Sequence, residues 1–130
     1  MSKTVLVVED NDLNLKLFNE LLQANGYDTL QASDGHDAVD ISRRFHPDLV
    51  LMDICLPGMS GLEATQRIKS DPETADIPVV AVTANAMKGD EQSVLEGGCD
   101  GYIAKPISIG TFLEVISRFL DEKPAADGPT

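Results

Sequence analysis

The 130-residue sequence predicts an α/β fold of the doubly wound class, in which helices cover both faces of a parallel sheet. Short apolar runs rich in β-branched residues, such as residues 5–8 and 77–82, are typical of strands buried on both faces. Between these runs, apolar residues recur at the spacing of an amphipathic helix. Strands that alternate with helices along a chain form parallel sheets, so the two patterns together indicate this fold class.

The elements are expected in a regular order. Strands are expected at residues 5–8, 27–32, 48–53, 77–82 and 100–104. The first helix is expected at residues 13–25, and the second around Ala38, Ile41 and Phe45. A third is expected to run from the end of the loop 56–61 through Ile68, and a fourth lies near residues 88–96. The last helix is expected to bury one apolar stripe, formed by Ile109, Phe112, Leu113, Ile116 and Leu120. Residues 1–121 are expected to form one domain, and residues 122–130, which contain two prolines and a glycine, a flexible tail.

The composition argues against several classes of function. The chain carries 10 Lys and Arg against 22 Asp and Glu, a formal net charge of −12, which opposes binding to nucleic acid or to anionic membrane surfaces. It begins without a charged and apolar leader, so we expect a cytoplasmic protein. The two cysteines, Cys55 and Cys99, form no C-x-x-C pair and lie in apolar runs, so reduced thiols are expected.

Polar side chains follow the predicted strands at their carboxyl ends, where open parallel sheets bind ligands. Glu9 and Asp10 follow the first strand and Asp53 ends the third. Their carboxylates would repel one another, so the site favours a cation, and oxygen ligands without histidine or thiolate favour Mg²⁺. Thr83 and Lys105 end the fourth and fifth strands, where they can supply a hydrogen bond and a positive charge. In this setting Asp53 is a candidate nucleophile for phosphoryl transfer.

These residues occur in motifs that resemble the receiver domain of two-component response regulators. The motifs are Glu9-Asp10, Met52-Asp53 with Leu56-Pro57-x-Met59-x-Gly61, Val82-Thr83-Ala84, and Lys105-Pro106. The resemblance covers residues 3–121. Two further segments, residues 9–18 and 86–91, are similar to a single-domain cell-cycle regulator of that family, which implies a role in cell-cycle or developmental control.

The resemblance implies a phosphoryl acceptor and a metal site. Asp53 would accept a phosphoryl group from a histidine kinase or a histidine phosphotransferase. Asp10, Asp53 and the backbone carbonyl of Cys55 would bind Mg²⁺, with Glu9 reaching the ion mainly through water. Glu9 stands where the family more often has Asp, which lengthens this arm by one methylene group.

The resemblance also implies a switch. Thr83 would move toward the phosphoryl group, Tyr102 would turn inward behind it, and Lys105 would hold the acyl phosphate. The sheet would have the flavodoxin-like strand order 2-1-3-4-5. The chain would be a signalling module and not an enzyme, contacting downstream regulatory proteins as a monomer or as a weak phosphorylation-dependent dimer.

Other functions use a similar sheet. A mid-relay phosphate carrier has the same site chemistry, and the sequence leaves this alternative open. An Mg²⁺-dependent phosphatase that forms an aspartyl phosphate is less favoured, because such enzymes need a second acid where this chain has Cys55. A flavin or nucleotide binder needs a loop rich in backbone amides after the first strand, whereas residues 9–12 here are Glu-Asp-Asn-Asp.

The first helix carries more leucines than contact with one sheet requires. On a helical wheel, the arc expected to face the core is formed by Leu17, Phe18 and Leu21. Leu15 and Leu22 are seven residues apart and share another side, and Leu13 lies at the margin of the core arc. We predict that Leu13, Leu15 and Leu22 form a docking patch for the phosphoryl donor; the alternative is that they are ordinary surface leucines.

Some residues invite a metal site but have simpler explanations. His36 and His46 belong to no ligand cluster, so we expect surface or helix-end histidines. Asp71, Glu73 and Asp76 lack the glycine of a calcium-binding loop, so we expect a solvated acidic loop.

Overall fold

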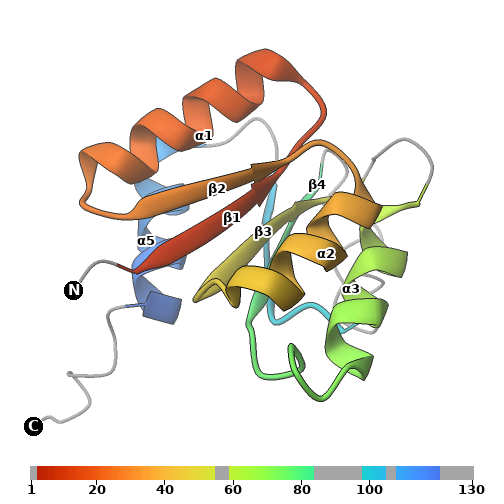
Figure 1. Cartoon of the computed structure of the whole chain (residues 1–130). Coiled ribbons are helices and arrows are strands. Elements are labelled where there is room, and N and C mark those ends of the chain that lie inside the picture. Colours follow the sequence, from red (N-terminus) through yellow and green to blue (C-terminus); the bar gives the residue numbers. More distant parts are fainter. Residues whose placement is uncertain (1–2, 55–58, 84–97, 105–107, 121–130) are drawn as a thin grey trace, which may run out of the picture.

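The computed structural model describes residues 3–54, 59–83, 98–104 and 108–120. Within these residues the chain forms a five-stranded parallel sheet in the order β2-β1-β3-β4-β5 (Figure 1). The strands are β1 (Thr4–Val8), β2 (Asp28–Ala32), β3 (Leu49–Asp53), β4 (Val79–Thr83) and β5 (Gly101–Ala104). The helices are α1 (Asp12–Ala24), α2 (Gly35–Phe45), α3 (Gly61–Ser70) and α5 (Ile109–Leu120). The predicted fold class and strand order are confirmed, and none of these helices is long and apolar enough to cross a bilayer.

Several predictions fall outside the described residues. They are the helix expected near residues 88–96, the tail at 122–130, and the site residues Cys55 and Lys105.

Helices cover both faces of the sheet. α1 and α5 lie on one face, and α2 and α3 lie on the other (Figure 1). In β1, Val5 and Val7 pack in the core cluster under α1 and α5, whereas Leu6 and Val8 pack in the cluster under α2 and α3. Because β1, β3 and β4 are buried on both faces, the sequence of each is a nearly continuous apolar run.

Capping residues set where the helices begin and end. The side chains of Asn11, Asp34 and Ser60 accept hydrogen bonds from first-turn N–H groups of α1, α2 and α3. α2 ends at His46, which adopts the left-handed conformation with φ 46°. The predicted helix-end position of His46 is therefore confirmed, and His36 is exposed on α2 as predicted.

Candidate functional site

Three carboxylates meet where β1 and β3 end. These strands are neighbours in the sheet, with Val8 opposite Met52. Glu9 and Asp10 follow β1, and Asp53 is the last residue of β3. One carboxylate oxygen from each of Glu9, Asp10 and Asp53 lies within 4.8 Å of the other two, and we call these three residues the acidic cluster. Across the described residues, no other group of three His, Cys, Asp or Glu side chains is placed to hold a metal ion.

Burial distinguishes the members of the acidic cluster. Glu9 and Asp53 are 1% and 4% exposed, whereas Asp10 is exposed. The N–H of Glu9 donates to the carbonyl of Ala32 at 3.0 Å, and its Oε2 accepts the N–H of Asn11 at 3.3 Å. Carboxylates this close together repel one another strongly in a partly buried site unless a cation compensates them. A set of carboxylate oxygens reached by solvent on one side fits Mg²⁺, which binds through a few carboxylates and keeps several waters.

Thr83 and Tyr102 lie on the two strands beyond Asp53. Asp53 is opposite Val82, and Thr83, the next residue, is 5% exposed at the end of β4. Tyr102 is opposite Ala81 and packs, partly buried, against the core cluster that contains Ala81. Residues that pair in a parallel ladder share a face of the sheet, as do residues two apart in a strand. Thr83 and Tyr102 are therefore on the same face, two rungs apart along the β4–β5 ladder.

The close approach of α3 limits the space around the backbone of Asp53. The N–H of Gly61 donates to the carbonyl of Ile54 at 3.0 Å. A Cβ atom at Gly61 would collide with the backbone carbonyl oxygen of Asp53 and would lie 2.8 Å from the Cα of Ile54. Only glycine fits here without moving the backbone of Asp53. The sequence motif contains Gly61, but this steric role depends on contact between two segments and could not be read from it.

The predicted core face of α1 is right for Phe18 and Leu21, which pack in the core cluster under α1 and α5, and wrong for the leucines around them. Leu22, which we predicted to be part of a docking patch, is fully buried, and Leu15 is partly buried against the same core cluster. Leu17, which we predicted to face the core, is 38% exposed, and Leu13 is 79% exposed. Leu15 and Leu22 do share a side of the helix, but it is the side that faces the protein interior.

The physical reason is that α1 packs against a helix as well as against the sheet. The ring of Phe18 stacks on Phe112 of α5 with a centroid distance of 5.3 Å and an interplanar angle of 12°. This contact turns Leu22 inward, so Leu22 cannot contact a partner protein. It leaves Leu13 and Leu17, one helical turn apart, on the exposed side.

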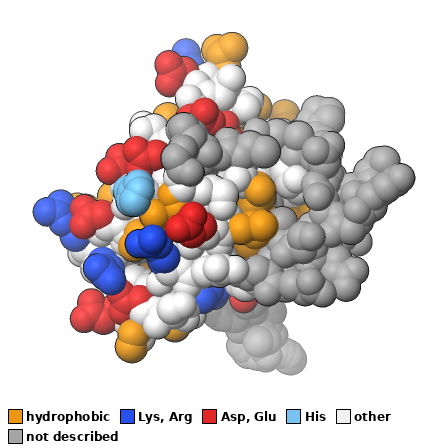
Figure 2. Space-filling model, turned by 90° about the vertical axis from the view of Figure 1, so that its right-hand side faces the viewer, with side chains coloured by type: hydrophobic (Ala, Val, Ile, Leu, Met, Phe, Trp, Pro, Cys, Tyr) orange, Lys and Arg blue, Asp and Glu red, His pale blue; other side chains and the backbone are white. Residues whose placement is uncertain are grey.

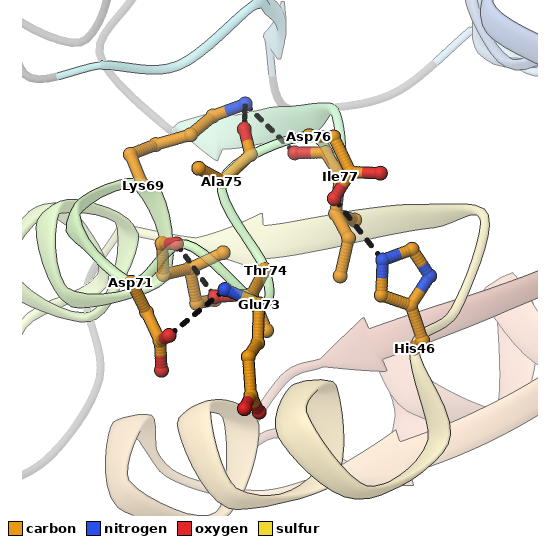
Figure 3. A network of polar contacts seen from close by, with 9 residues as sticks. His46, Lys69, Asp71, Glu73, Thr74, Ala75, Asp76 and Ile77 are labelled. Carbon is orange, nitrogen blue, oxygen red and sulfur yellow. Dashed lines mark hydrogen bonds and ion pairs between the residues drawn. The ribbon is translucent and has the colours of Figure 1, made fainter.

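The acidic loop after α3 is held to α2 and its C-cap by two polar pairs, Arg43 with Asp71 and His46 with Asp76, of which Figure 3 shows the second. Glu73 and Asp76 are exposed, as predicted, but the side chain of Asp71 is only 15% exposed. The N–H of Glu73 and the Arg43 guanidinium, 2.6 Å away, both bond the Asp71 carboxylate and lower its pKa. The hydrogen bond between His46 Nε2 and Asp76 Oδ1, at 3.1 Å, lowers the pKa of Asp76. Local sequence patterns could not reveal these pairs, because their partners are 28 and 30 residues apart.

A groove of about 740 Å³ lies between α2 and α3, apart from the acidic cluster. Basic, acidic and hydrophobic side chains are interleaved on this face of the molecule (Figure 2). Within the groove lining, Arg43 pairs with Asp71 and Arg67 pairs with Glu63. Because the charges in this groove compensate one another, the acidic cluster is the better candidate for a functional site.

Cys99 packs just before β5, as predicted. It is 6% exposed, and its Sγ lies 3.8 Å from the hydroxyl of Thr65. Burial raises the pKa of the Cys99 thiol. Since the thiolate is the reactive form, a buried thiol with a raised pKa suits a packing role.

Comparisons with a family model, with curated proteins and with solved structures all indicate the same family. The family model described as response regulator receiver domain matches residues 5–117. The polar-differentiation response regulator DivK of Brucella ovis is 53% identical over 122 residues, which cover 94% of this chain and 99% of that protein. DivK of Brucella anthropi is 52% identical over the same shares of the two chains.

A solved structure agrees as well. The receiver domain of a sensor histidine kinase from Pseudomonas aeruginosa PAO1, solved with a magnesium ion coordinated in its active-site cleft, superposes with a TM-score of 0.85. It is 33% identical in sequence, and the match covers 92% of this chain and 98% of that one. With its parallel sheet, its acidic cluster and these relatives, the chain belongs to the response regulator receiver domain family.

Proposed function

We propose that the chain is a response regulator that accepts a phosphoryl group on Asp53 and signals by contact with other proteins. The observation that carries the proposal is the acidic cluster, in which a nearly buried carboxylate lies beside two others that suit a divalent cation. A histidine kinase or a histidine phosphotransferase would supply the phosphoryl group. In this proposal the chain is a cytoplasmic signalling module and not an enzyme.

The chemistry proposed for Asp53 is nucleophilic attack. One of its carboxylate oxygens would attack the phosphorus of a phosphohistidine while the phosphorus–nitrogen bond breaks and its electron pair returns to the imidazole ring. The acidic cluster and the backbone carbonyl of Cys55 would hold Mg²⁺, which when bound neutralises charge on the phosphoryl oxygens. The Thr83 hydroxyl would donate a hydrogen bond to the phosphoryl group, and Lys105 would add a positive charge.

The proposed switch connects this chemistry to the neighbouring strand. Thr83 and Tyr102 share one face of the sheet, and Tyr102 packs against the same core cluster as Ala81. A movement of Thr83 toward a phosphoryl group would empty space next to this cluster, and the Tyr102 ring would turn inward to fill it. Closely packed side chains in a protein core favour a small number of discrete arrangements, which suits a two-state switch.

The proposed docking surface for the phosphoryl donor is the exposed side of α1. Leu13 lies in the first turn of α1, directly after the acidic cluster, and Leu17 follows it one turn later. Leu15 packs against the core on the other side of the helix, so it takes no part in this surface. A donor helix must approach this rim to bring its histidine to Asp53, so exposed apolar groups here would supply binding energy at the right place.

The identity to the Brucella DivK proteins supports a role in polar differentiation, as part of cell-cycle or developmental control. The alternative, a carrier in the middle of a phosphorelay, differs in the fate of the phosphoryl group. Phosphotransfer from purified kinases, followed by incubation with purified histidine phosphotransferases, separates the two. A carrier passes the phosphoryl group on rapidly, whereas a terminal regulator keeps it until hydrolysis.

The test of the proposed function is labelling of Asp53. Incubation with acetyl phosphate and MgCl₂ should add the mass of one phosphoryl group to the wild-type chain, in a bond that is labile to base. Asp53→Asn should abolish the labelling because the amide is not a nucleophile, whereas Asp28→Asn, at an exposed position at the amino end of β2, should not. Equal labelling of the Asp53→Asn protein would contradict the assignment.

A further inference from the structure

Lys69, near the end of α3, joins the chain segments that lead into two strands of the sheet. Its Nζ donates to the carbonyl of Ile77 at 2.7 Å and lies 3.5 Å from the carbonyl of Ala75, on the segment before β4 (Figure 3). The same Nζ pairs with Oδ2 of Asp100 at 2.8 Å, directly before β5. An ammonium group has three N–H donors, so these three acceptors can use all of them. The Lys69 side chain is only 22% exposed, so little of it is left to water.

A second residue of α3 contacts the same segment before β5. Thr65, one helical turn before Lys69, is fully buried, and its hydroxyl oxygen accepts from Sγ of Cys99 at 3.8 Å. Gly98 lies against both residues: a Cβ atom there would be 3.6 Å from Cγ of Lys69 and 3.7 Å from Cγ2 of Thr65. α3 therefore contacts three consecutive residues, 98–100, that lead into β5.

β5 depends on such anchors more than the inner strands do. It is an edge strand of four residues, and among the described strands it pairs with β4 alone. Asp100 ties its start to β4, because its carboxylate accepts the N–H of Val79 at 2.8 Å and its own N–H donates to the Val79 carbonyl at 2.7 Å. From the side of α5, the ring of Phe119 is close enough that a Cβ atom at Gly101 would lie 3.3 Å from it. The start of β5 is therefore held by α3, β4 and α5.

Tyr102 is the second residue of β5, and it packs against the core cluster under α2 and α3. In the proposed switch, the Tyr102 ring turns when Thr83 of the neighbouring strand moves. This response requires that β5 itself stays in place. A strand that is free to shift at its start would let the ring change its orientation without any movement of Thr83, and the two states would then mix.

We infer that Lys69 is a positioning residue of the proposed switch: it fixes the start of β5 to α3 and β4, so that the orientation of Tyr102 follows the state of Asp53. The inference rests on the proposed function, in which alone Tyr102 has a signalling role. A single Nζ atom bonds the carbonyl of Ile77 and the carboxylate of Asp100 together, which an apolar side chain could not do. Partial burial strengthens such charge-assisted hydrogen bonds.

The experiment follows the Tyr102 ring in the full chain. The sequence contains two tyrosines, Tyr27 and Tyr102, so incorporated fluorotyrosine gives two resonances in fluorine NMR spectra, which a Tyr27→Phe variant assigns. Spectra are recorded with and without acetyl phosphate and MgCl₂, and intact mass gives the phosphorylated fraction of each sample. In the wild-type chain, the Tyr102 resonance should shift in proportion to that fraction.

Lys69→Met removes the ammonium group and keeps an unbranched apolar stem. In the unphosphorylated variant the Tyr102 resonance should already lie nearer to its phosphorylated position, so that its shift on phosphorylation falls to roughly half or less of the wild-type value. The matched control is Arg67→Met on the same helix. Arg67 pairs with Glu63 at 3.4 Å within α3, so this variant should keep the wild-type shift.

Asp100→Asn covers the case in which Lys69→Met does not fold. The amide oxygen can still accept the N–H of Val79, but the charge that pairs with Lys69 is lost, so this variant should also reduce the shift. Folded Lys69→Met and Asp100→Asn proteins with the wild-type Tyr102 shift would overturn the inference, since a purely structural role lowers the free energy of unfolding and leaves the shift unchanged. A wild-type chain that is phosphorylated on Asp53 but shows no Tyr102 shift would overturn the proposed switch, and the inference with it.

Discussion

Two leucines of α1, both of which the sequence suggested as docking residues, should behave in opposite ways. Leu22 is fully buried in the core cluster that joins α1 to β1, β3 and α5, and Leu13 is 79% exposed. Replacing a fully buried leucine by alanine costs about 2–5 kcal/mol, made up of the lost transfer free energy and the cavity left behind. Leu22 is 0% exposed in a cluster with residues of four strands and of α5, so we expect the cavity left by its removal to collapse little. We therefore expect a loss of roughly 3–5 kcal/mol for Leu22→Ala and of about 0.5 kcal/mol or less for Leu13→Ala.

Urea unfolding followed by far-UV circular dichroism measures both free energies of unfolding. Phosphotransfer from a panel of phosphorylated histidine phosphotransferases measures docking. Leu13→Ala should slow that transfer while labelling by acetyl phosphate stays normal, and Phe45→Ala, which removes an exposed apolar side chain from α2, should slow neither. Equal losses of unfolding free energy in Leu13→Ala and Leu22→Ala would refute the packing argument. Unchanged phosphotransfer to Leu13→Ala would refute the docking surface.

Three further outcomes are expected. Millimolar MgCl₂ should stabilise the folded chain more than NaCl at matched ionic strength, as measured in thermal melts. At a 10- to 100-fold excess over Kd, the free energy of unfolding should rise by on the order of 1–3 kcal/mol. Asp10→Ala, which removes one carboxylate of the acidic cluster, should reduce this stabilisation. The folded pKa of Asp71 is lowered by the N–H of Glu73 and by a guanidinium, so its contribution to stability is fully present above the ordinary aspartate pKa of about 3.9. That contribution is lost as the pH falls through the lower folded pKa, and Asp71→Asn should therefore flatten the acid limb of a stability–pH curve; an unchanged limb would contradict this. In a Cys55→Ser background, Cys99 should react with a thiol-alkylating reagent at mildly alkaline pH only as fast as the protein opens, so rapid labelling of the native protein in mass spectra would show that the thiol is accessible.

The fold and the acidic cluster could be predicted because both depend on features that are local in sequence. A strand buried on both faces must be apolar along its length, and residues 49–52 of β3 satisfy this condition before Asp53 ends the strand. Once the strands are parallel, their carboxyl ends share one edge of the sheet. Glu9, Asp10 and Asp53 then have to meet if β1 and β3 are neighbours, and the family resemblance supplied that strand order.

The orientation of α1 could be predicted only in part: Phe18 and Leu21 face the core as expected, but Leu17 and Leu22 have exchanged their expected places. A helical wheel gives the angles between Leu15, Leu17 and Leu22, but it does not say which arc is buried when the helix has apolar residues on most of its circumference. The side of α1 that is buried is decided by Phe18, which stacks on Phe112 of α5. A contact with an element near the other end of the chain leaves no local signal.

Aspartate is used at both ends of the sheet, with different consequences. At the amino end, the carboxylate of Asp48 accepts the N–H of Thr4 at 2.8 Å while its own N–H donates to the Thr4 carbonyl at 2.8 Å. Asp100 forms the same reciprocal pair with Val79, at 2.8 and 2.7 Å, and its carboxylate also pairs with Lys69 at 2.8 Å. Strands present N–H groups at their amino ends and carbonyl groups at their carboxyl ends, so an aspartate is bonded by the backbone most readily where the strands begin. The amino-end aspartates therefore fix the strands, whereas the three acids at the carboxyl end form the candidate cation site.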